Sequence, residues 1–470
     1  MDFFFRKPRW KILQKQKIFR YASDDDFLKF ARLVAKKPFS VILLSGSDHD
    51  SALYSLACWN PYAIFRAKAN CCRINMLQEA RDKTLNANPL KAFGKMMESH
   101  SGDYEIETFP FLGGAVGFVA YEAKNAIERL PQTAVDDLNL PEIWAIWPQN
   151  IIIHNRKSNE LWYFFLSPLD ASYPALPAPL QAEADFFSVG ELRSNFDKAK
   201  YTSAIEKILQ YIRDGHVYQV NLSQRFSWIF TGNPFELWTK LFKKNPAPFY
   251  AFINAGDFFV LSTSMERFLY RRGDYIETRP IKGTRPRGKS AEEDENNKHE
   301  LLTHPKDDAE LSMIVDLLRN DLGKVCRPGS IRVAEHKRLE TYQNVFHLVS
   351  IVQGILNPAT THEQILNATF PGGSITGCPK IRSMEIIDEL EPTVRHVYTG
   401  AIGYWGFHNN MDTNIAIRTM IIKGNEAHLS VGGGVVFDSD PEMEYEETVH
   451  KGRTFFEILS EFGKKRSRVA

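Results

Sequence analysis

Residues 415–436 have the sequence IAIRTMII-KGNE-AHLSVGGGVV, in which two apolar, strand-like runs flank a polar turn. Gly424 and Asn425 in this turn tolerate the backbone angles of a tight connection, so the pattern predicts a β-hairpin formed by residues 415–422 and 427–436. Antiparallel pairing of neighbouring strands is the first indication of the fold class.

The rest of the chain alternates irregularly between strand-like and helix-like segments, without an internal repeat. Tyr201, Ile205, Ile208 and Ile212 recur at helical spacing, and Gly215 follows as a predicted C-cap. We therefore predict an α+β protein with large, mostly antiparallel sheets. The predicted strands are residues 40–44, 111–117, 151–154, 217–222, 258–263 and 275–281.

A proline-rich stretch marks the predicted domain boundary. Pro168, Pro174, Pro177 and Pro179 fall within residues 167–183, and this spacing disfavours both a regular helix and a central strand. We predict an amino-terminal region over residues 1–166, a linker over 167–190 and a carboxy-terminal domain over 191–462.

Bulk composition excludes several classes of function. The 470 residues carry 58 basic and 57 acidic side chains, so the net charge of +1 gives no indication of nucleic acid or of an anionic membrane as a partner. Six basic residues between positions 6 and 17 interrupt the apolar start, and no uncharged run is long enough to cross a bilayer. The five cysteines are scattered and odd in number, which favours a reducing cytoplasm.

Two predicted helices each present a pair of carboxylates. Asp307 and Glu310 are three residues apart, as are Glu444 and Glu447, and Lys451 follows on the same face as the second pair. Four carboxylates on two helices are hard oxygen ligands, which suit Mg²⁺ better than zinc. Taken alone, the same spacing also describes two solvated helix faces.

Three consecutive glycines interrupt the second strand of the hairpin. Gly432, Gly433 and Gly434 weaken a strand through lost side-chain packing, so their presence indicates that a ligand approaches the backbone there. Exposed amide groups would bind a carboxylate, with Lys451 or Arg418 completing its neutralisation. A bulge or crowded packing explains the glycines equally well.

Residues 278–287, TRPIKGTRPR, place Lys282 between a strand end and a glycine turn, among three arginines. Neighbouring cations and partial burial would both favour the neutral, nucleophilic amine. A lysine at a strand end is otherwise usually solvated.

Residues 370–380, FPGGSITGCPK, form a glycine-rich loop that leads into a helix opening at Pro379. Such a helix start can bind an anion, although the spacing is not that of a P-loop. The predicted apolar side of the helix consists of Ile381, Met384, Ile387 and Leu390.

Read together, these segments resemble the chorismate-utilising enzymes, a family that includes anthranilate synthase component I, aminodeoxychorismate synthase component I, and the isochorismate and salicylate synthases. The resemblance covers about residues 196–459, and residues 43–46 and 113–117 match more loosely. It implies an anthranilate synthase component I-like fold, in which large antiparallel sheets pack as a sandwich-like core with surrounding helices. The matching strings are YQVNL at 218–222, PIKGT at 280–284, MIVDL at 313–317 with RND at 319–321, the loop at 370–380, MDTNIAIR at 411–418 and GGGVVFDSDPEMEYEE at 432–447.

The resemblance implies a role for each matching position. Glu310 and Glu447 look like direct Mg²⁺ ligands, with Asp307 and Glu444 acting through metal-bound water, and Glu266 resembles the general acid that helps the 4-hydroxyl to leave. Before this glutamate the family usually has proline, where this chain has Met265. The implied substrate contacts are Arg418, Tyr398, Lys451, Gly432, Gly433 and Gly434 around the enolpyruvyl carboxylate, and Gly283, Thr284, Ser374 and His347 along the remaining wall.

Two positions divide the family. Members that add water to chorismate have a lysine where this chain has Gln219, and anthranilate synthases typically have alanine where it has Lys282. In the family members that aminate carbon 4 of chorismate, this lysine is thought to attack ring carbon 2 before ammonia adds at carbon 4. The resemblance therefore implies formation of 4-amino-4-deoxychorismate for 4-aminobenzoate and folate synthesis, with the enolpyruvyl ether retained. The chain has no Gly-x-Cys-x-Gly nucleophile elbow, so ammonia is expected from a glutamine amidotransferase subunit.

Two other functions remain open from the sequence. One is anthranilate synthase component I, and the other is a non-catalytic subunit of the same fold, against which the joint presence of the acidic and basic site residues argues. The amino-terminal half of this family can also hold tryptophan. Ser45 and the segment Pro248, Phe249 and Tyr250 are candidates for such a pocket, although an ordinary core explains them almost as well.

Overall fold

The computed structural model describes the chain except for residues 1–10, 48, 100–108, 168–177, 180–185 and 464–470. The helices of the described residues are α1 (Asp24–Ala35), α2 (Pro89–Ser99), α3 (Lys198–Arg213), α4 (Pro234–Lys244), α5 (Ala291–Thr303), α6 (Pro305–Gly323), α7 (His362–Thr369), α8 (Lys380–Leu390) and α9 (Pro441–Gly463), with short 3₁₀ turns η1 (Tyr121–Ala126) and η2 (Gly373–Ile375). The strands of the first half are β1 (Lys11–Phe19), β2 (Ser40–Leu44), β3 (Tyr54–Lys68), β4 (Cys71–Met76), β5 (Arg81–Asn86), β6 (Gly114–Val119), β7 (Ile143–Asn155), β8 (Glu160–Ser167) and β9 (Phe187–Ser194). Those of the second half are β10 (Gln219–Gly232), β11 (Phe249–Asn254), β12 (Phe258–Ser264), β13 (Arg267–Arg272), β14 (Tyr275–Arg279), β15 (Ile281–Pro286), β16 (Arg332–Thr341), β17 (Val345–Ile355), β18 (Gly377–Cys378), β19 (Ala401–Gly406), β20 (Asn410–Ile415), β21 (Thr419–Lys423) and β22 (Glu426–Val435).

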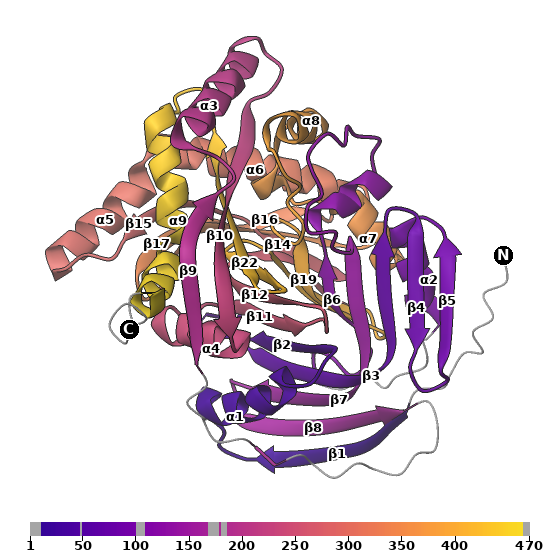
Figure 1. Ribbon diagram of the computed structural model, residues 1–470. Coiled ribbons are helices and arrows are strands. Elements are labelled where there is room, and N and C mark those ends of the chain that lie inside the picture. Colours follow the sequence, from indigo (N-terminus) through magenta and orange to yellow (C-terminus); the bar gives the residue numbers. More distant parts are fainter. Residues whose placement is uncertain (1–10, 48, 100–108, 168–177, 180–185, 464–470) are drawn as a thin grey trace.

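The described strands form one continuous sheet of 22 strands, and its neighbours pair antiparallel throughout. The main path runs β9–β10–β22–β21–β12–β11–β2–β3–β7–β6–β19–β20–β13–β14–β17. A sheet of this size curls instead of staying flat, and its parts then face one another across an apolar core. The ring centroids of Phe118 on β6 and Phe258 on β12 lie 6.1 Å apart in this core. The α+β class with antiparallel sheets and surrounding helices is confirmed (Figure 1).

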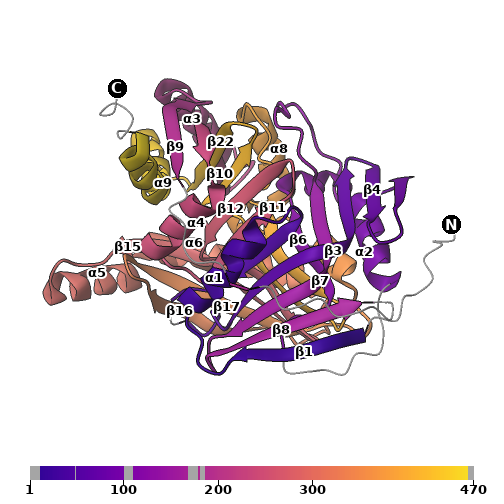
Figure 2. The same ribbon diagram turned by 60° about the horizontal axis from the view of Figure 1, so that its bottom comes forward.

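Two buried apolar clusters hold the sheet and helices together. The larger contains Trp144, Trp147 and Trp405, and the smaller contains Trp238 and Phe252. Helices α1 and α4 cover the part of the sheet that contains β2, β11 and β12, while α6 lies against β15 and β17 (Figure 2). This arrangement leaves α6 and α9 on the same side of β22, where the predicted carboxylates lie.

The predicted hairpin is present, with one difference. β21 pairs with β22 from Met420↔Leu429 to Lys423↔Glu426, and Gly424 in the turn has a φ of 59°. The run 415–422 is not one strand, however, because β20 ends at Ile415 and Arg418 has a φ of 49°. β-branched residues avoid this left-handed backbone conformation. It breaks the strand, so that the chain turns from β20 into β21.

Other predicted elements shift by a few residues for identifiable reasons. The strand predicted over 111–117 begins at Gly114, where a Cβ atom would lie 2.1 Å from the carbonyl oxygen of Trp405. The segment 275–281 divides into β14 and β15 at Pro280, which has no N–H for the ladder. In α8, Met384 and Ile387 are buried as predicted, but Ile381 is 48% exposed and does not belong to the apolar side.

Most of the predicted linker lies outside the described residues, and the division into 1–166 and 191–462 stays a prediction. Strands from the two sides of the linker pair with each other, because β2 lies beside β11 and β6 beside β19. The two halves therefore share one sheet. Among the described helices, none combines the length and the apolar character that crossing a membrane requires.

Candidate active site

One cavity of about 830 Å³ lies between β22, β15, α6 and the middle of α9. Every residue predicted for the chorismate site lines it, although these residues come from positions as far apart as 266 and 451. The lining residues predicted from sequence are Glu266, Lys282, Gly283, Thr284, Asp307, Glu310, His347, Ser374, Tyr398, Arg418, Gly432, Gly433, Gly434, Glu444, Glu447 and Lys451.

The four carboxylates enter the cavity from two helices. Asp307 and Glu310 lie in the first turns of α6, where Arg285 Nη2 is 3.1 Å from Asp307 and Lys282 Nζ is 3.6 Å from Glu310. On α9, Lys451 Nζ is 2.6 Å from Glu447, and this charge lowers the pKa of Glu447. Glu444 is buried, and burial raises its pKa although Ser439 Oγ donates a hydrogen bond of 2.6 Å to Oε1.

The donor set fits a hard divalent cation. Glu444 Oε2 is buried without a hydrogen-bond partner, and the oxygens Glu444 Oε2 and Glu447 Oε1 lie 3.2 and 3.5 Å from the position a Cβ of Gly433 would occupy. No group of three or more acidic, histidine or cysteine side chains in the described ranges is close enough to enclose a metal by itself. A cation that keeps several waters and takes few protein ligands, as Mg²⁺ does, needs no such closed group.

Glu266 is a buried carboxyl with an unusual titration range. It is only 5% exposed, and Ser374 Oγ donates a hydrogen bond of 2.6 Å to its Oε1. Burial raises the pKa of Glu266 to about 7, although the hydrogen bond from Ser374 and the positive charge of Lys282 act in the opposite direction. A carboxyl with such a pKa is suited to donate a proton near neutral pH.

The surroundings of Lys282 differ from the prediction. The arginines expected to crowd it each bind carboxylates: Arg279 binds Glu277 and Asp50, Arg285 binds Glu300 and Asp307, and Arg287 binds Asp294. The nearest ionic partner of Lys282 is instead the carboxylate of Glu310. The charges of the three arginines are engaged by these carboxylates, so proximity in the sequence did not decide which charge lies nearest the Lys282 amine.

The glycine triplet has two separate explanations. A Cβ at Gly432 would lie 2.6 Å from the carbonyl oxygen of Leu222, and one at Gly434 would lie 2.1 Å from Gln219 Nε2. These two glycines permit close packing against β10. A Cβ at Gly433 would instead point at Glu444, Glu447 and Lys451, so this glycine keeps the cavity open. Crowded packing therefore explains Gly432 and Gly434, and the approach of a ligand at Gly433 stays a prediction.

Cationic and neutral groups also line the cavity. Arg418 lines the cavity, and burial lowers the pKa of its guanidinium group. No carboxylate of the described chain lies within ion-pair distance of it. His347 receives or donates a hydrogen bond of 2.9 Å with Thr284 Oγ1, and burial lowers the pKa of His347 to about 3. Tyr398 is buried, which raises the pKa of its hydroxyl. The wall thus offers one cation and neutral hydrogen-bonding groups to an anionic ligand.

Sequence reasoning missed a buried ion pair behind this wall. Arg395 and Glu391 are 4% and 5% exposed, and Arg395 donates two hydrogen bonds to Glu391, of 2.9 and 2.6 Å. Arg395 also donates to the carbonyl oxygens of Asn221 and Ile375, while Ser223 donates to Glu391. The pair therefore joins β10, the glycine-rich loop and the segment after α8. Its spacing of four residues is common on exposed helices, so nothing local marked it.

Replacement of Arg395 by methionine is expected to destabilise the protein strongly. It would leave the Glu391 charge buried without its partner, which lowers the free energy of unfolding by roughly 3–5 kcal/mol. Urea denaturation followed by circular dichroism measures this loss. Arg382→Met is the matched control, because Arg382 pairs with Glu385 on the surface of α8 and contributes at most about 1 kcal/mol. Equal stability of the Arg395 variant and the wild type would contradict the assigned role.

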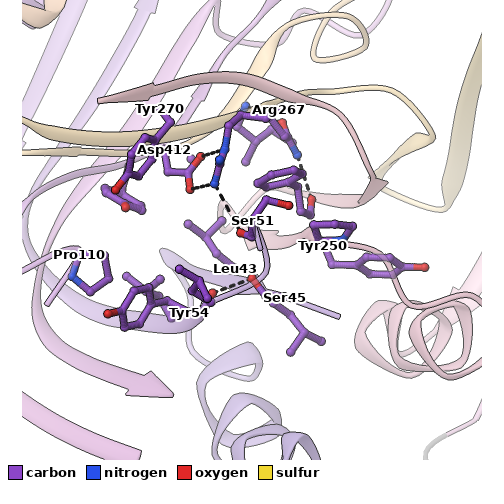
Figure 3. Close-up of a pocket in the computed structure, with 18 of the residues that line it drawn as sticks. Leu43, Ser45, Ser51, Tyr54, Pro110, Tyr250, Arg267, Tyr270 and Asp412 are labelled. Carbon is purple, nitrogen blue, oxygen red and sulfur yellow. Dashed lines mark hydrogen bonds and ion pairs between the residues drawn. The ribbon is translucent and has the colours of Figure 1, made fainter. Parts of the chain in front are cut away.

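A second cavity, of about 190 Å³, brings together Ser45, Pro248, Phe249 and Tyr250 as predicted (Figure 3). Ser45 Oγ donates to the carbonyl oxygen of Tyr54, and the Tyr250 hydroxyl points away from the cavity toward the carbonyl oxygen of Asn245. Arg267, ion-paired with Asp412 and Glu277, forms a polar wall that the sequence did not indicate.

The chain is similar to several known proteins. A family model described as chorismate binding enzyme matches residues 40–457. The chain is 37% identical over 461 residues to aminodeoxychorismate synthase component 1 of Bacillus subtilis, covering 95% of this chain and 96% of that protein. It is 35% identical to anthranilate synthase component 1 of Thermus thermophilus, covering 92% and 94%. The crystal structure of anthranilate synthase component I from Streptococcus pneumoniae superposes with a TM-score of 0.76 at 30% identity, covering 87% and 93%.

Proposed function

Because the chain belongs to the chorismate-binding enzymes, we propose that it converts chorismate and ammonia to 4-amino-4-deoxychorismate as component 1 of an aminodeoxychorismate synthase. The observation that carries this assignment is Lys282, whose amine lines the same cavity as the buried carboxyl of Glu266. Anthranilate synthases are expected to have alanine at this position, and alanine supplies no nucleophile. The five cysteines, all of which are free thiols, support a reducing compartment such as the cytosol.

In the proposed reaction, Lys282 Nζ forms a bond to ring carbon 2 while the ring double bonds shift and the bond between carbon 4 and its hydroxyl breaks. Glu266 donates the proton with which the hydroxyl leaves as water. Ammonia then bonds to carbon 4, and the bond from carbon 2 to Lys282 breaks to restore the free amine. A proton from the new ammonium group returns Glu266 to its acid form. The enolpyruvyl ether takes no part and stays in the product.

The two carboxylates of the substrate would meet different groups of the cavity. Arg418, Lys451 and the backbone beside Gly433 face the enolpyruvyl carboxylate in this proposal. Glu310 and Glu447 would hold Mg²⁺ directly, with Asp307 and Glu444 acting through water, and the bound cation would neutralise the ring carboxylate. Glu310 and Glu447, which would hold the cation, also lie beside Lys282 and Lys451.

Glu447→Gln should raise the Mg²⁺ concentration needed for half-maximal activity by at least about tenfold, since even loss of an outer-sphere partner commonly weakens metal binding by that factor. Glu446→Gln is the matched control, because its carboxylate lies on the outer face of α9 beside Lys198. Rates measured across a Mg²⁺ titration test this. An identical Mg²⁺ dependence in the Glu447 variant and the wild type would exclude it as a ligand.

Identification of the product tests the assignment directly. The purified chain is incubated with chorismate, Mg²⁺ and ammonium at mildly alkaline pH, and the products are separated by liquid chromatography and identified by mass spectrometry. Aminodeoxychorismate is expected. Anthranilate with pyruvate would assign the chain to the tryptophan branch, which relatives such as the Thermus thermophilus protein represent. Absence of any Mg²⁺-dependent product would indicate a non-catalytic subunit.

We also propose that the cavity at Ser45 binds an aromatic amino acid, with tryptophan as the first candidate. Pro248 and Phe249 supply apolar walls, while Asp50 and the Arg267–Asp412 pair supply polar groups for the backbone of a free amino acid. Calorimetric titration should show saturable binding of L-tryptophan to the wild type. Ser45→Phe would fill the cavity and abolish the binding. Absence of binding to the wild type would leave this cavity as a feature of the core.

A further inference from the structure

A buried ion pair joins α6 to the segment that carries Ser374. The amine of Lys380, at the start of α8, donates to the carboxylate of Asp321 near the end of α6, and the two side chains are 14% and 2% exposed. The same amine donates a hydrogen bond of 3.1 Å to the carbonyl oxygen of Thr369, the last residue of α7. Lys380, the last residue of the glycine-rich loop, therefore contacts the residue just before that loop begins, and Asp321 holds this junction on α6.

The glycine-rich loop places the hydrogen-bond partner of the buried Glu266 carboxyl. Ser374 lies in the loop, and its hydroxyl donates the hydrogen bond to Glu266. On one side, Asn221 of β10 donates a hydrogen bond of 2.8 Å to the Ser374 carbonyl oxygen. On the other side, Leu317 of α6 packs so closely that a Cβ atom at Gly373 would lie 2.5 Å from Leu317 Cδ2. The position of the Ser374 hydroxyl thus depends on contacts with both β10 and α6.

Helix α6 carries both the anchor of this loop and two of the carboxylates in the cavity. Asp307 and Glu310 lie in its first turns, and Asp321 follows Glu310 by eleven residues, which is about 16 Å along the helix axis. Neither Asp321 nor Lys380 is among the residues that line the cavity. Any influence of this pair on the reaction must therefore pass through the position of the loop.

Stability alone does not account for the burial of these two charges. Removing ionic groups from water is costly, and apolar side chains of similar volume often stabilise a core as well as a buried ion pair does. Burial lowers the pKa of Lys380, although the negative charge of Asp321 acts in the opposite direction. What an ion pair with directed hydrogen bonds adds is a defined position for the groups that it joins.

We propose that Lys380 and Asp321 are positioning residues for Glu266, because they hold the glycine-rich loop on α6 and thereby keep the Ser374 hydroxyl within hydrogen-bond distance of the carboxyl. The inference rests on the proposed function, which assigns Glu266 as the general acid. The hydrogen bond from Ser374 lowers the pKa of Glu266 against the effect of burial. Without the ion pair the loop is no longer held on α6, so this hydrogen bond is lost and the pKa of Glu266 rises.

The test compares three variants of the full chain with the wild type. Lys380→Met removes the amine but leaves the Asp321 charge buried, so part of its effect is a loss of stability. Lys380→Met/Asp321→Asn removes both charges and should recover most of that stability. Lys324→Met is the matched control. The Lys324 amine binds the same carboxylate and the carbonyl oxygen of Ala368, but its side chain is 53% exposed and lies outside the loop.

Two measurements follow the state of Glu266 in each variant. Consumption of chorismate with Mg²⁺ and ammonium gives kcat and KM across pH, at a constant concentration of free ammonia. Carbon-13 NMR of protein labelled at the glutamate carboxyl carbons follows the titration of Glu266 directly, and Glu266→Gln identifies its signal. The charged groups that lower the pKa of Glu266, Lys282 from β15 and Lys451 from α9, are unchanged in every variant. Urea denaturation gives the stability.

Both Lys380 variants should lose roughly ten- to a hundredfold in kcat, the effect expected of a small misplacement in an active site. The pH midpoints of kcat/KM and of the Glu266 signal should rise by roughly 1, about the contribution of one hydrogen bond to a carboxylate. The Lys324 variant should keep the wild-type kcat and both wild-type midpoints.

A double variant that recovers the wild-type kcat and pH midpoints together with its stability would overturn the proposal, because the pair would then serve stability alone. Unchanged midpoints in both Lys380 variants would overturn it as well. Anthranilate as the product, or no turnover by the wild type, would refute the proposed function instead. The NMR midpoint still decides the role of the pair in that case, because it requires no reaction.

Discussion

Lys282→Ala should lose the ability to form aminodeoxychorismate from chorismate and ammonium, with a decrease in kcat of about two to four orders of magnitude. This is the range expected when a group that acts directly on the reacting atoms is removed. Lys282 is largely enclosed by the cavity wall, and its only ionic partner among the described residues is Glu310. Alanine leaves no other amine positioned at the same point of β15.

Three measurements separate loss of chemistry from loss of structure. The melting temperature should stay close to that of the wild type, and Mg²⁺-dependent binding of chorismate should persist, because Arg418 and Lys451 are unchanged. Lys289→Ala, a change to an exposed lysine in the segment after β15, should behave as the wild type. Product formation by Lys282→Ala within twofold of the wild type would rule out covalent catalysis by this residue.

Glu266→Gln should lower kcat/KM by roughly 10²–10⁴-fold, the usual contribution of a general acid. Glutamine keeps the shape of the side chain and can still bind Ser374, but it has no proton to donate to the departing hydroxyl. Glu266 is therefore the second residue whose replacement should nearly abolish turnover.

The pH dependence gives a sharper test of the same residue. Because burial raises the pKa of Glu266 to about 7, the carboxyl is protonated below this pH and loses its proton above it. The wild-type kcat/KM for chorismate, measured with the concentration of free ammonia held constant, should therefore fall as the pH rises through about 7. The residual activity of Glu266→Gln should lack this decrease. A decrease that persists unchanged in the variant would assign it to another group.

The elements that the sequence predicted correctly are those whose pattern lies within one short stretch of the chain. The alternation in residues 427–436 and the turn at Gly424 produced β22 and its hairpin partner, and helical spacing correctly paired Asp307 with Glu310 and Glu444 with Glu447. Errors arose where a neighbour in space overrode the local pattern. Arg418 takes a positive φ inside a run of strand-forming residues, and Ile381 is exposed although its spacing matches the apolar side of α8.

The same division applies to the site. Resemblance of long motifs named the residues that line the main cavity, but the directions of their side chains depended on the sheet. Arg279, Arg285 and Arg287 are close to Lys282 in sequence and bind the carboxylates of Asp50, Asp307 and Asp294, which lie in other segments. Arg395, which closes the back of the cavity, had no motif at all, because only its burial with Glu391 distinguishes it from a surface pair.

Composition and periodicity were sufficient for the fold class and the carboxylate pairs, and the resemblance of the ordered motifs was sufficient for the chorismate-binding family, because each of these depends on residues that are close in sequence. Only the tertiary structure placed the two carboxylate pairs in one cavity and assigned separate reasons to Gly432, Gly433 and Gly434. These features depend on the register between strands such as β10 and β22. Register is set by packing across the whole core, so a short stretch of sequence does not contain it.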